Sequence, residues 1–167
     1  MTATLRRTLS LLACAGLLLP GLARAAEGDT TTVYITGTLV DAPECTVNSN
    51  NKVDVFFGDD VVTSQVTGEN YKKQIAYTLN CSGLAQQGLI MTLNGDRAGF
   101  NSTLLKTSNT GLGIRLLNGT NPVEPGEEIR FNYTSQPVLY AVLKAQNTAT
   151  LDTGPFTGSA TLVIAYQ

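Results

Sequence analysis

Short runs of apolar and β-branched residues, broken by Gly, Asn and Pro, recur along the chain after residue 25. No stretch of about a dozen residues there carries apolar positions at helical spacing between proper caps. The pattern therefore predicts an all-β domain. The predicted strands are residues 33–40, 53–57, 72–81, 89–94, 112–117, 129–132, 138–144 and 156–166.

Turn sequences separate these runs, as at residues 94–96, 118–122, 124–126 and 152–155. Short strands punctuated in this way predict an immunoglobulin-like sandwich, in which alternate residues of each strand face a core between two sheets. The chain contains no Trp. The buried Trp of antibody domains is therefore absent, which argues against a true antibody-type domain but not against the sandwich.

Residues 1–25 have the organisation of a secretory signal peptide. Arg6 and Arg7 precede a short apolar run at residues 8–22, and residues 23–25 offer the small side chains of a cleavage site. We expect this segment to be removed, which leaves a mature chain of 142 residues. Cys14 leaves a lipoprotein site open as an alternative, although only a few apolar residues precede it.

Removal of the signal changes the charge and the cysteine count. The mature chain keeps 8 basic and 13 acidic residues, a formal charge of −5, which argues against nucleic acid or anionic lipid as a partner. Cys45 and Cys81 remain as an even pair in an exported chain, so we expect a disulfide between them. Such a bridge would stabilise the fold by about 3 to 4.5 kcal/mol.

The N-terminal start of the mature chain is polar and rich in Thr, and it turns into an extended strand. Alternate residues Thr31, Val33, Ile35, Gly37 and Leu39 project to one side. The first residues of a domain are loose unless something holds them. The pattern therefore predicts a strand that needs a groove to occupy.

The C-terminal segment has one strongly apolar face. Gly154 is the fourteenth residue from the end, and the chain stops at Gln167. A sandwich that requires a further strand beside this segment would have none left to provide. The residues on the apolar face are Phe156, Gly158, Ala160, Leu162, Ile164 and Tyr166.

Together these features resemble the pilins of the chaperone-usher pathway, particularly the minor subunits of type 1-like fimbriae. The resemblance covers the mature chain and rests on the signal peptide, the alternating start before Gly37, the pair Cys45 and Cys81, the position of Gly154 and the ending 161–167. It implies an incomplete immunoglobulin-like β-sandwich, the pilin fold, that lacks its final strand. The sandwich would occupy residues 37–167, preceded by a donor-strand extension at residues 26–36.

The resemblance also implies how such a subunit assembles. A periplasmic pilus chaperone fills a hydrophobic groove first, and the donor strand of a neighbouring subunit then replaces it at the outer-membrane usher. The chain would be exported through the periplasm to a fimbrium at the cell surface. The donor residues would be Thr31, Val33, Ile35 and Gly37. The groove and chaperone contacts would be Gly154, Phe156, Gly158, Ala160, Leu162, Ile164 and Tyr166.

No pattern of catalytic residues is present. The chain has no His and no Gly-x-Ser-x-Gly turn, and the mature chain has no free Cys if the disulfide forms. The adjacent pairs 59–60 and 127–128 lack the spacing of a calcium loop or an acid/base pair. We expect no enzymatic activity, cofactor, metal or small-molecule substrate.

The sequence therefore predicts a structural pilus subunit that contributes to cell adhesion, more readily a minor or adaptor subunit than a two-domain adhesin. A major rod subunit remains an alternative. A second is a secreted binding module whose first strand completes its own sandwich. A third is a β-sandwich hydrolase.

Overall fold

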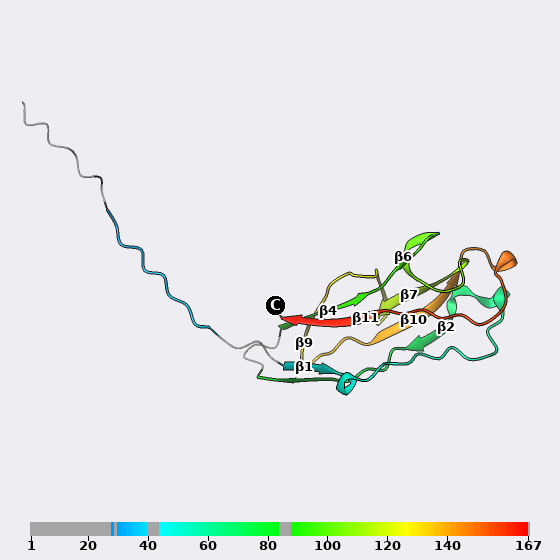
Figure 1. Cartoon of the computed structure of the whole chain (residues 1–167), viewed down its shortest axis with the longest axis horizontal. Helices are drawn as coiled ribbons and strands as arrows, with labels where there is room; N and C mark the ends of the chain where they lie inside the picture. Colours follow the sequence, from blue (N-terminus) through cyan, green and yellow to red (C-terminus); the bar gives the residue numbers. More distant parts are fainter. Residues whose placement is uncertain (1–27, 29, 40–43, 84–87, 167) are drawn as a thin grey trace, which may run out of the picture. The chain divides into compact units, whose positions relative to one another are not determined.

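The computed structural model describes residues 28, 30–39, 44–83 and 88–166 (Figure 1). The predicted signal peptide, with Cys14, lies outside this range. The chain forms two units, residues 1–37 and 38–167. Residues 30–37 of the first unit are assigned to no helix or strand.

The second unit is built from two main antiparallel sheets and a smaller strand pair. One sheet has the order β2 (Thr67–Gln74), β10 (Leu139–Ala145), β7 (Leu112–Asn118), β6 (Asn101–Lys106) and β5 (Arg97–Ala98), with β8 (Asn121–Val123) also on β7. The other has the order β11 (Thr161–Tyr166), β4 (Gly88–Asn94) and β9 (Ile129–Asn132). The pair is β1 (Glu44–Val47) with β3 (Leu79–Ser82), and the 3-10 turns are η1 (Asn48–Asn50), η2 (Thr63–Gln65) and η3 (Thr148–Thr150).

The core lies between the two main sheets. On β4, Met91 and Leu93 are buried, and on β10 Leu139, Ala141 and Leu143 are buried, all in one cluster. Alternate residues of each strand supply this cluster because successive side chains of a strand point to opposite faces. The prediction of an all-β, immunoglobulin-like sandwich is confirmed.

Two predicted strands differ because the backbone changes sheets within them. The predicted strand 72–81 is two strands, since β2 pairs with β10 whereas β3 pairs with β1. The predicted strand 156–166 is a strand only from Thr161 onward. Before that point Ser108 N donates to Thr157 O, at 2.8 Å, and Gly158 forms an isolated bridge with Thr107. This segment therefore first contacts the residues that follow β6, and only from Thr161 onward does it pair with β4.

Two further strand predictions find no ladder. Residues 33–39 form none, and Val40 lies outside the described residues. Residues 53–57 are assigned to no strand, although their side chains alternate in burial as expected. The strands β1, β5, β6 and β8 were not predicted. Two of them lack a strand pattern, because β6 begins with three polar residues and β8 contains a Pro.

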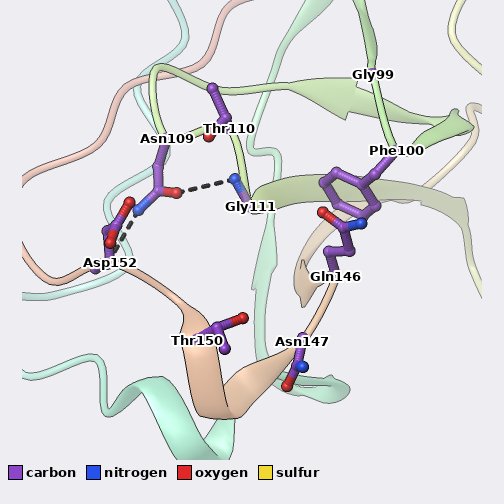
Figure 2. Close-up of a pocket in the computed structure, with 9 residues that line it drawn as sticks. All are labelled: Gly99, Phe100, Asn109, Thr110, Gly111, Gln146, Asn147, Thr150 and Asp152. Carbon is purple, nitrogen blue, oxygen red and sulfur yellow. Dashed lines mark hydrogen bonds between the residues drawn. The ribbon is translucent and has the colours of Figure 1, made fainter.

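The loop between β6 and β7 is held by its own side chains. Thr107 is 4% exposed, and among the residues that the structure describes it is the one buried residue with a polar side chain. Its hydroxyl lies 2.9 Å from Asn109 O and 2.8 Å from Leu112 O. The Asn109 side chain accepts a hydrogen bond from Gly111 N, at 3.1 Å, and donates one to Asp152 O, at 3.0 Å (Figure 2). These bonds fix the loop against the segment after β10.

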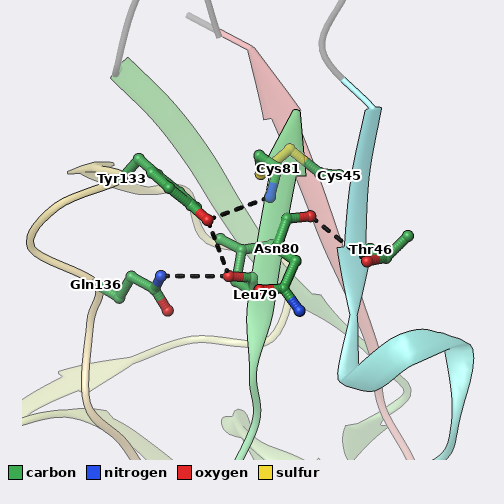
Figure 3. Close-up of a disulfide and its surroundings, with 7 residues drawn as sticks. All are labelled: Cys45, Thr46, Leu79, Asn80, Cys81, Tyr133 and Gln136. Atoms are coloured by element: carbon green, nitrogen blue, oxygen red, sulfur yellow. Dashed lines mark hydrogen bonds between the residues drawn. A yellow bond between two sulfur atoms is a disulfide. The ribbon is translucent and has the colours of Figure 1, made fainter. Parts of the chain in front are cut away.

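The predicted disulfide is present. Cys45 and Cys81 face each other in the β1–β3 ladder, with Cα atoms 4.1 Å apart (Figure 3). The Tyr133 hydroxyl accepts a hydrogen bond from Cys81 N, at 3.3 Å, and Gln136 donates one to Leu79 O, at 3.5 Å. The disulfide therefore joins β1 to β3, and the side chains of Tyr133 and Gln136 also hold β3 in place.

Candidate functional site: a candidate subunit interface

Strand β11 lies at the edge of its sheet. It pairs with β4 along its whole length, from Thr161 opposite Asn94 to Tyr166 opposite Leu89. Within the described part of the chain, its other edge carries no ladder partner. An unpaired edge presents a row of free N–H and C=O groups to which another strand can add.

The inner face of β11 is apolar and incompletely covered. Leu162 and Ile164 pack against the core cluster but are only partly buried, as is Tyr166. The core strand β10, by contrast, has five of its seven residues buried. The core is therefore open to solvent along the predicted C-terminal strand.

A second segment without a ladder borders the same core. Val55 is partly buried against the core cluster and Phe57 belongs to it, whereas Phe56 points outward and is 70% exposed. The Phe57 ring packs against Phe156, with centroids 6.1 Å apart. Residues 53–57 and β11 thus form two rims over one core. The sequence predicted 53–57 only as an ordinary strand, because its alternating pattern is that of any half-buried strand.

Tyr166 is the last residue of β11, and its hydroxyl is enclosed. Its side chain is partly buried, and its hydroxyl oxygen is fully enclosed without a hydrogen-bond partner among the described residues. An enclosed hydroxyl without a partner costs about 1 to 3 kcal/mol relative to a satisfied one.

The first half of the predicted interface segment lies outside β11. Gly154 has φ of +125°, a conformation that favours glycine. A Cβ on Gly158 would lie 2.9 Å from Ile114 Cδ1 and 3.3 Å from Lys106 O, so a larger residue would require the Ile114 side chain to shift. Gly158 and Ala160 line a shallow cleft of about 530 Å³ together with residues 94–96 and 106–108. This cleft lies on the side of β4 and β6.

The predicted donor residues are exposed. The side chains of Val33 and Ile35 are 74% and 91% exposed, and Thr31 is exposed as well. A Cβ built on Gly37 would meet no described atom within 4 Å. The described conformation therefore does not itself require glycine at this position.

Tyr77, which lies between β2 and β3, is the described titratable group whose pKa is clearly shifted from its ordinary value. Its hydroxyl donates a hydrogen bond to Pro137 O, at 2.6 Å. Burial raises the pKa of Tyr77 from 10.0 to about 12, because it disfavours the phenolate. This side chain is part of the packing around the core rather than of the open edge.

The described residues contain no group of three or more His, Cys, Asp or Glu side chains placed to hold a metal ion. Within the same residues, none of the helices has the length and apolar character needed to cross a membrane.

Comparison with known proteins shows the family to which the chain belongs. The family model described as fimbrial protein matches residues 33–167. The chain belongs to the fimbrial protein family. It is also 37% identical over 135 residues to the uncharacterized fimbrial-like protein YfcR of Escherichia coli (strain K12), with 77% of each chain covered. Membership of this family makes the chain a structural subunit of a surface fimbrium.

Solved pilus subunits share the fold of this fimbrial protein. The P pilus adaptor subunit PapF is 20% identical with a TM-score of 0.57, over 76% of this chain and 98% of that one. The P pilus rod subunit PapA is 22% identical with a TM-score of 0.57, over 83% of this chain and all of that one, 100%. These likenesses extend the pilin fold to the body of this chain.

Proposed function

We propose that this fimbrial subunit polymerises by donor-strand complementation and exchange. The free edge of β11 above a partly open core carries the proposal. In this mechanism a strand from outside lies between residues 53–57 and β11. Its backbone extends the ladder of β11, while its alternate side chains cover the core.

The donor in turn is the subunit's own leading segment. Val33 and Ile35 lie on one side of it and are exposed. Burial of two such side chains in the groove of a neighbouring subunit contributes about 3 to 6 kcal/mol before ordering costs. Thr31 extends the same face, and Gly37 allows close approach of two backbones.

A periplasmic pilus chaperone covers the open core before assembly, and an outer-membrane usher receives the complex. An uncovered apolar edge supports this step, because such an edge aggregates when left free. The proposed contacts of the chaperone are Leu162, Ile164 and Tyr166, on the inner face of β11, with residues 154–160 leading into it. The assembled fimbrium contributes to cell adhesion, and this chain serves in it as a minor or adaptor subunit.

The decisive experiment mixes the purified chaperone complex of the mature subunit with a peptide copying residues 29–40. We expect the peptide to displace the chaperone, measured by size-exclusion chromatography and native mass spectrometry. The control is the same peptide carrying Ile35→Asp, which should not displace it because a buried carboxylate is strongly disfavoured. A subunit that is monomeric and stable without a chaperone would support a self-completed module instead.

A further inference from the structure

The backbone turns to the left directly after β1 (Figure 3). Asn48, Ser49 and Asn50, which form η1, have φ angles of 48°, 51° and 63°. Three consecutive residues therefore lie in the left-handed region, which Gly and Asn visit more readily than other residues do. Among the described residues other than Gly, Tyr71 is the one further residue with a positive φ. Unfavourable φ angles are thus concentrated in η1.

Hydrogen bonds within the turn hold this conformation. The Asn48 side chain donates to Lys52 O, at 2.8 Å, and to Asn51 O, at 3.4 Å. Asn51 N donates to Asn48 O, at 2.9 Å. The Ser49 side chain is exposed, and within the described chain only the backbone oxygen of this residue accepts a bond, from the Asn51 side chain at 3.5 Å. The left-handed backbone of Ser49 is therefore imposed by its neighbours.

The turn ends the pairing of β1 with β3. The ladder reaches Val47 opposite Leu79, and Asn48 N still donates to Thr78 O, at 2.8 Å. Beyond this bond, residues 49–57 share no backbone hydrogen bond with the described residues of β2 or of the chain that joins β2 to β3.

A straight continuation of β1 would find a free strand edge. Each step forward along β1 is one step back along β3, so the same register would place Lys52 opposite Gln74 and Asp54 opposite Lys72. β2 is the end strand of its sheet, and within the described chain its other edge has no ladder partner. Opposite charges at Asp54 and Lys72 would favour the pair. The left-handed turn diverts the chain from this pairing.

The turn instead directs residues 53–57 over the open core. Val55 packs against the core cluster, and Phe57 belongs to it. The Phe57 ring also contacts Phe156, in the segment that leads into β11. The second rim is therefore present because the chain does not continue along β2.

We infer that η1 positions the second rim of the acceptor groove, because its left-handed backbone keeps residues 53–57 away from the free edge of β2 and over the core. Ser49 is a positioning residue, which acts through its backbone conformation and not by contact with an incoming strand. The inference rests on the proposed function, since a groove with two rims matters only if a donor strand enters it.

The test compares Ser49→Val with Ser49→Gly in the purified chaperone complex of the mature subunit. Both changes remove the exposed hydroxyl, but Gly adopts the left-handed region freely whereas the β-branched Val disfavours it. The peptide copying residues 29–40 should displace the chaperone about tenfold more slowly from Ser49→Val than from Ser49→Gly. Ser49→Ala should lie between them, which keeps the comparison decisive if Ser49→Val is not recovered from the periplasm.

Ser102 provides the matched control. It is exposed on β6, and within the described chain its backbone oxygen accepts a bond from Arg97 while its side chain makes none. Strands favour β-branched residues over Gly, so Ser102→Val should unfold at a higher temperature than Ser102→Gly. The order at Ser49 should be the reverse. The rate of displacement should be equal for the two variants at Ser102.

Hydrogen exchange followed by mass spectrometry distinguishes a misplaced rim from a general loss of stability. In Ser49→Val, the amides of residues 67–74 should exchange more slowly than in the original chain, because residues 52–57 would pair with β2. A general loss of stability would instead make these amides exchange faster.

Faster exchange of residues 67–74 in Ser49→Val would overturn the inference, as would equal displacement rates for the Val, Ala and Gly variants at Ser49. Either result would leave donor-strand exchange in place, provided that the peptide displaces the chaperone from the original chain. If the peptide displaces no chaperone from the original chain, the proposed function and this inference are both wrong.

Discussion

Phe57 packs against Phe156 with ring centroids 6.1 Å apart and planes inclined by 47°. This contact joins residues 53–57, which form no ladder, to the segment that leads into β11. Between the described residues of these two segments there is no backbone hydrogen bond. Side-chain packing therefore holds the two rims over the core.

Replacing Phe57 by Ala should lower the free energy of unfolding of the mature chain by about 3 kcal/mol, since it removes a buried ring. Urea denaturation followed by circular dichroism would measure the change. Phe56→Ala is the control, because Phe56 is 70% exposed and its loss should cost less than about 0.5 kcal/mol. Equal costs at the two positions would contradict the inward and outward alternation of this segment.

Ile35→Asp should leave export and chaperone binding intact but block incorporation of this subunit onto the neighbour whose groove it fills. The proposed contact buries Ile35, and a carboxylate in its place would lose its hydration without a partner. The content of the subunit in sheared fimbriae would be measured by immunoblot. Thr36→Asp, on the opposite face of the same strand, should be incorporated normally. Normal fimbriae with Ile35→Asp would remove the donor role.

Tyr166→Ser should weaken capture by the chaperone and lower the periplasmic level of the subunit, because it removes a large part of the inner face of β11. Tyr166→Phe should not, since the hydroxyl has no described hydrogen-bond partner. Periplasmic levels and co-purification with the chaperone provide the measurement. If Ser and Phe give the same level as Tyr, the proposed chaperone contact at Tyr166 is wrong.

The double replacement Cys45→Ser with Cys81→Ser should cost about 4 kcal/mol of unfolding free energy, as expected for a bridge between residues 36 apart. The disulfide restricts the unfolded chain, so its removal favours unfolding. Chemical denaturation of the oxidised chain and of the variant would give the difference. A reduced but unmutated chain should behave like the variant, and a chain insensitive to reduction would contradict the assignment.

The raised pKa of Tyr77 predicts that the free energy of unfolding falls at high pH. Its pKa is about 12 in the folded chain against 10.0 ordinarily, so the folded state holds a proton that the unfolded state has released. The contribution of Tyr77 to the free energy of unfolding is fully present below pH 10, and it declines as the pH rises from about 10 to about 12. Unfolding free energies measured across this range should show the decline, and Tyr77→Phe should reduce it. An equal decline in the variant would contradict the role of Tyr77.

The sequence was sufficient for the sandwich and the disulfide, because these depend on local alternation and on a pair of cysteines. The family followed from the resemblance to chaperone-usher pilins. It was less accurate where a single run of residues serves two sheets. Alternation continues through residues 72–81 and 156–166, but a strand pattern does not reveal which neighbour each half pairs with. Register of this kind is decided by tertiary contacts.

The candidate interface shows the same limit. The apolar face of Leu162, Ile164 and Tyr166 could be predicted from period two alone. The second rim could not, since Val55 and Phe57 have the pattern of any half-buried strand, and only the missing ladder distinguishes them.

The position of the disulfide has a mechanical consequence. Along the chain, Cys45 comes shortly after residues 30–39, so tension applied through that leading segment would enter the body at β1. Hydrogen bonds alone would let a four-residue strand peel away one rung at a time. The covalent link to Cys81 instead passes the pull directly to β3, so β1 would stay attached to the body even if its hydrogen bonds broke.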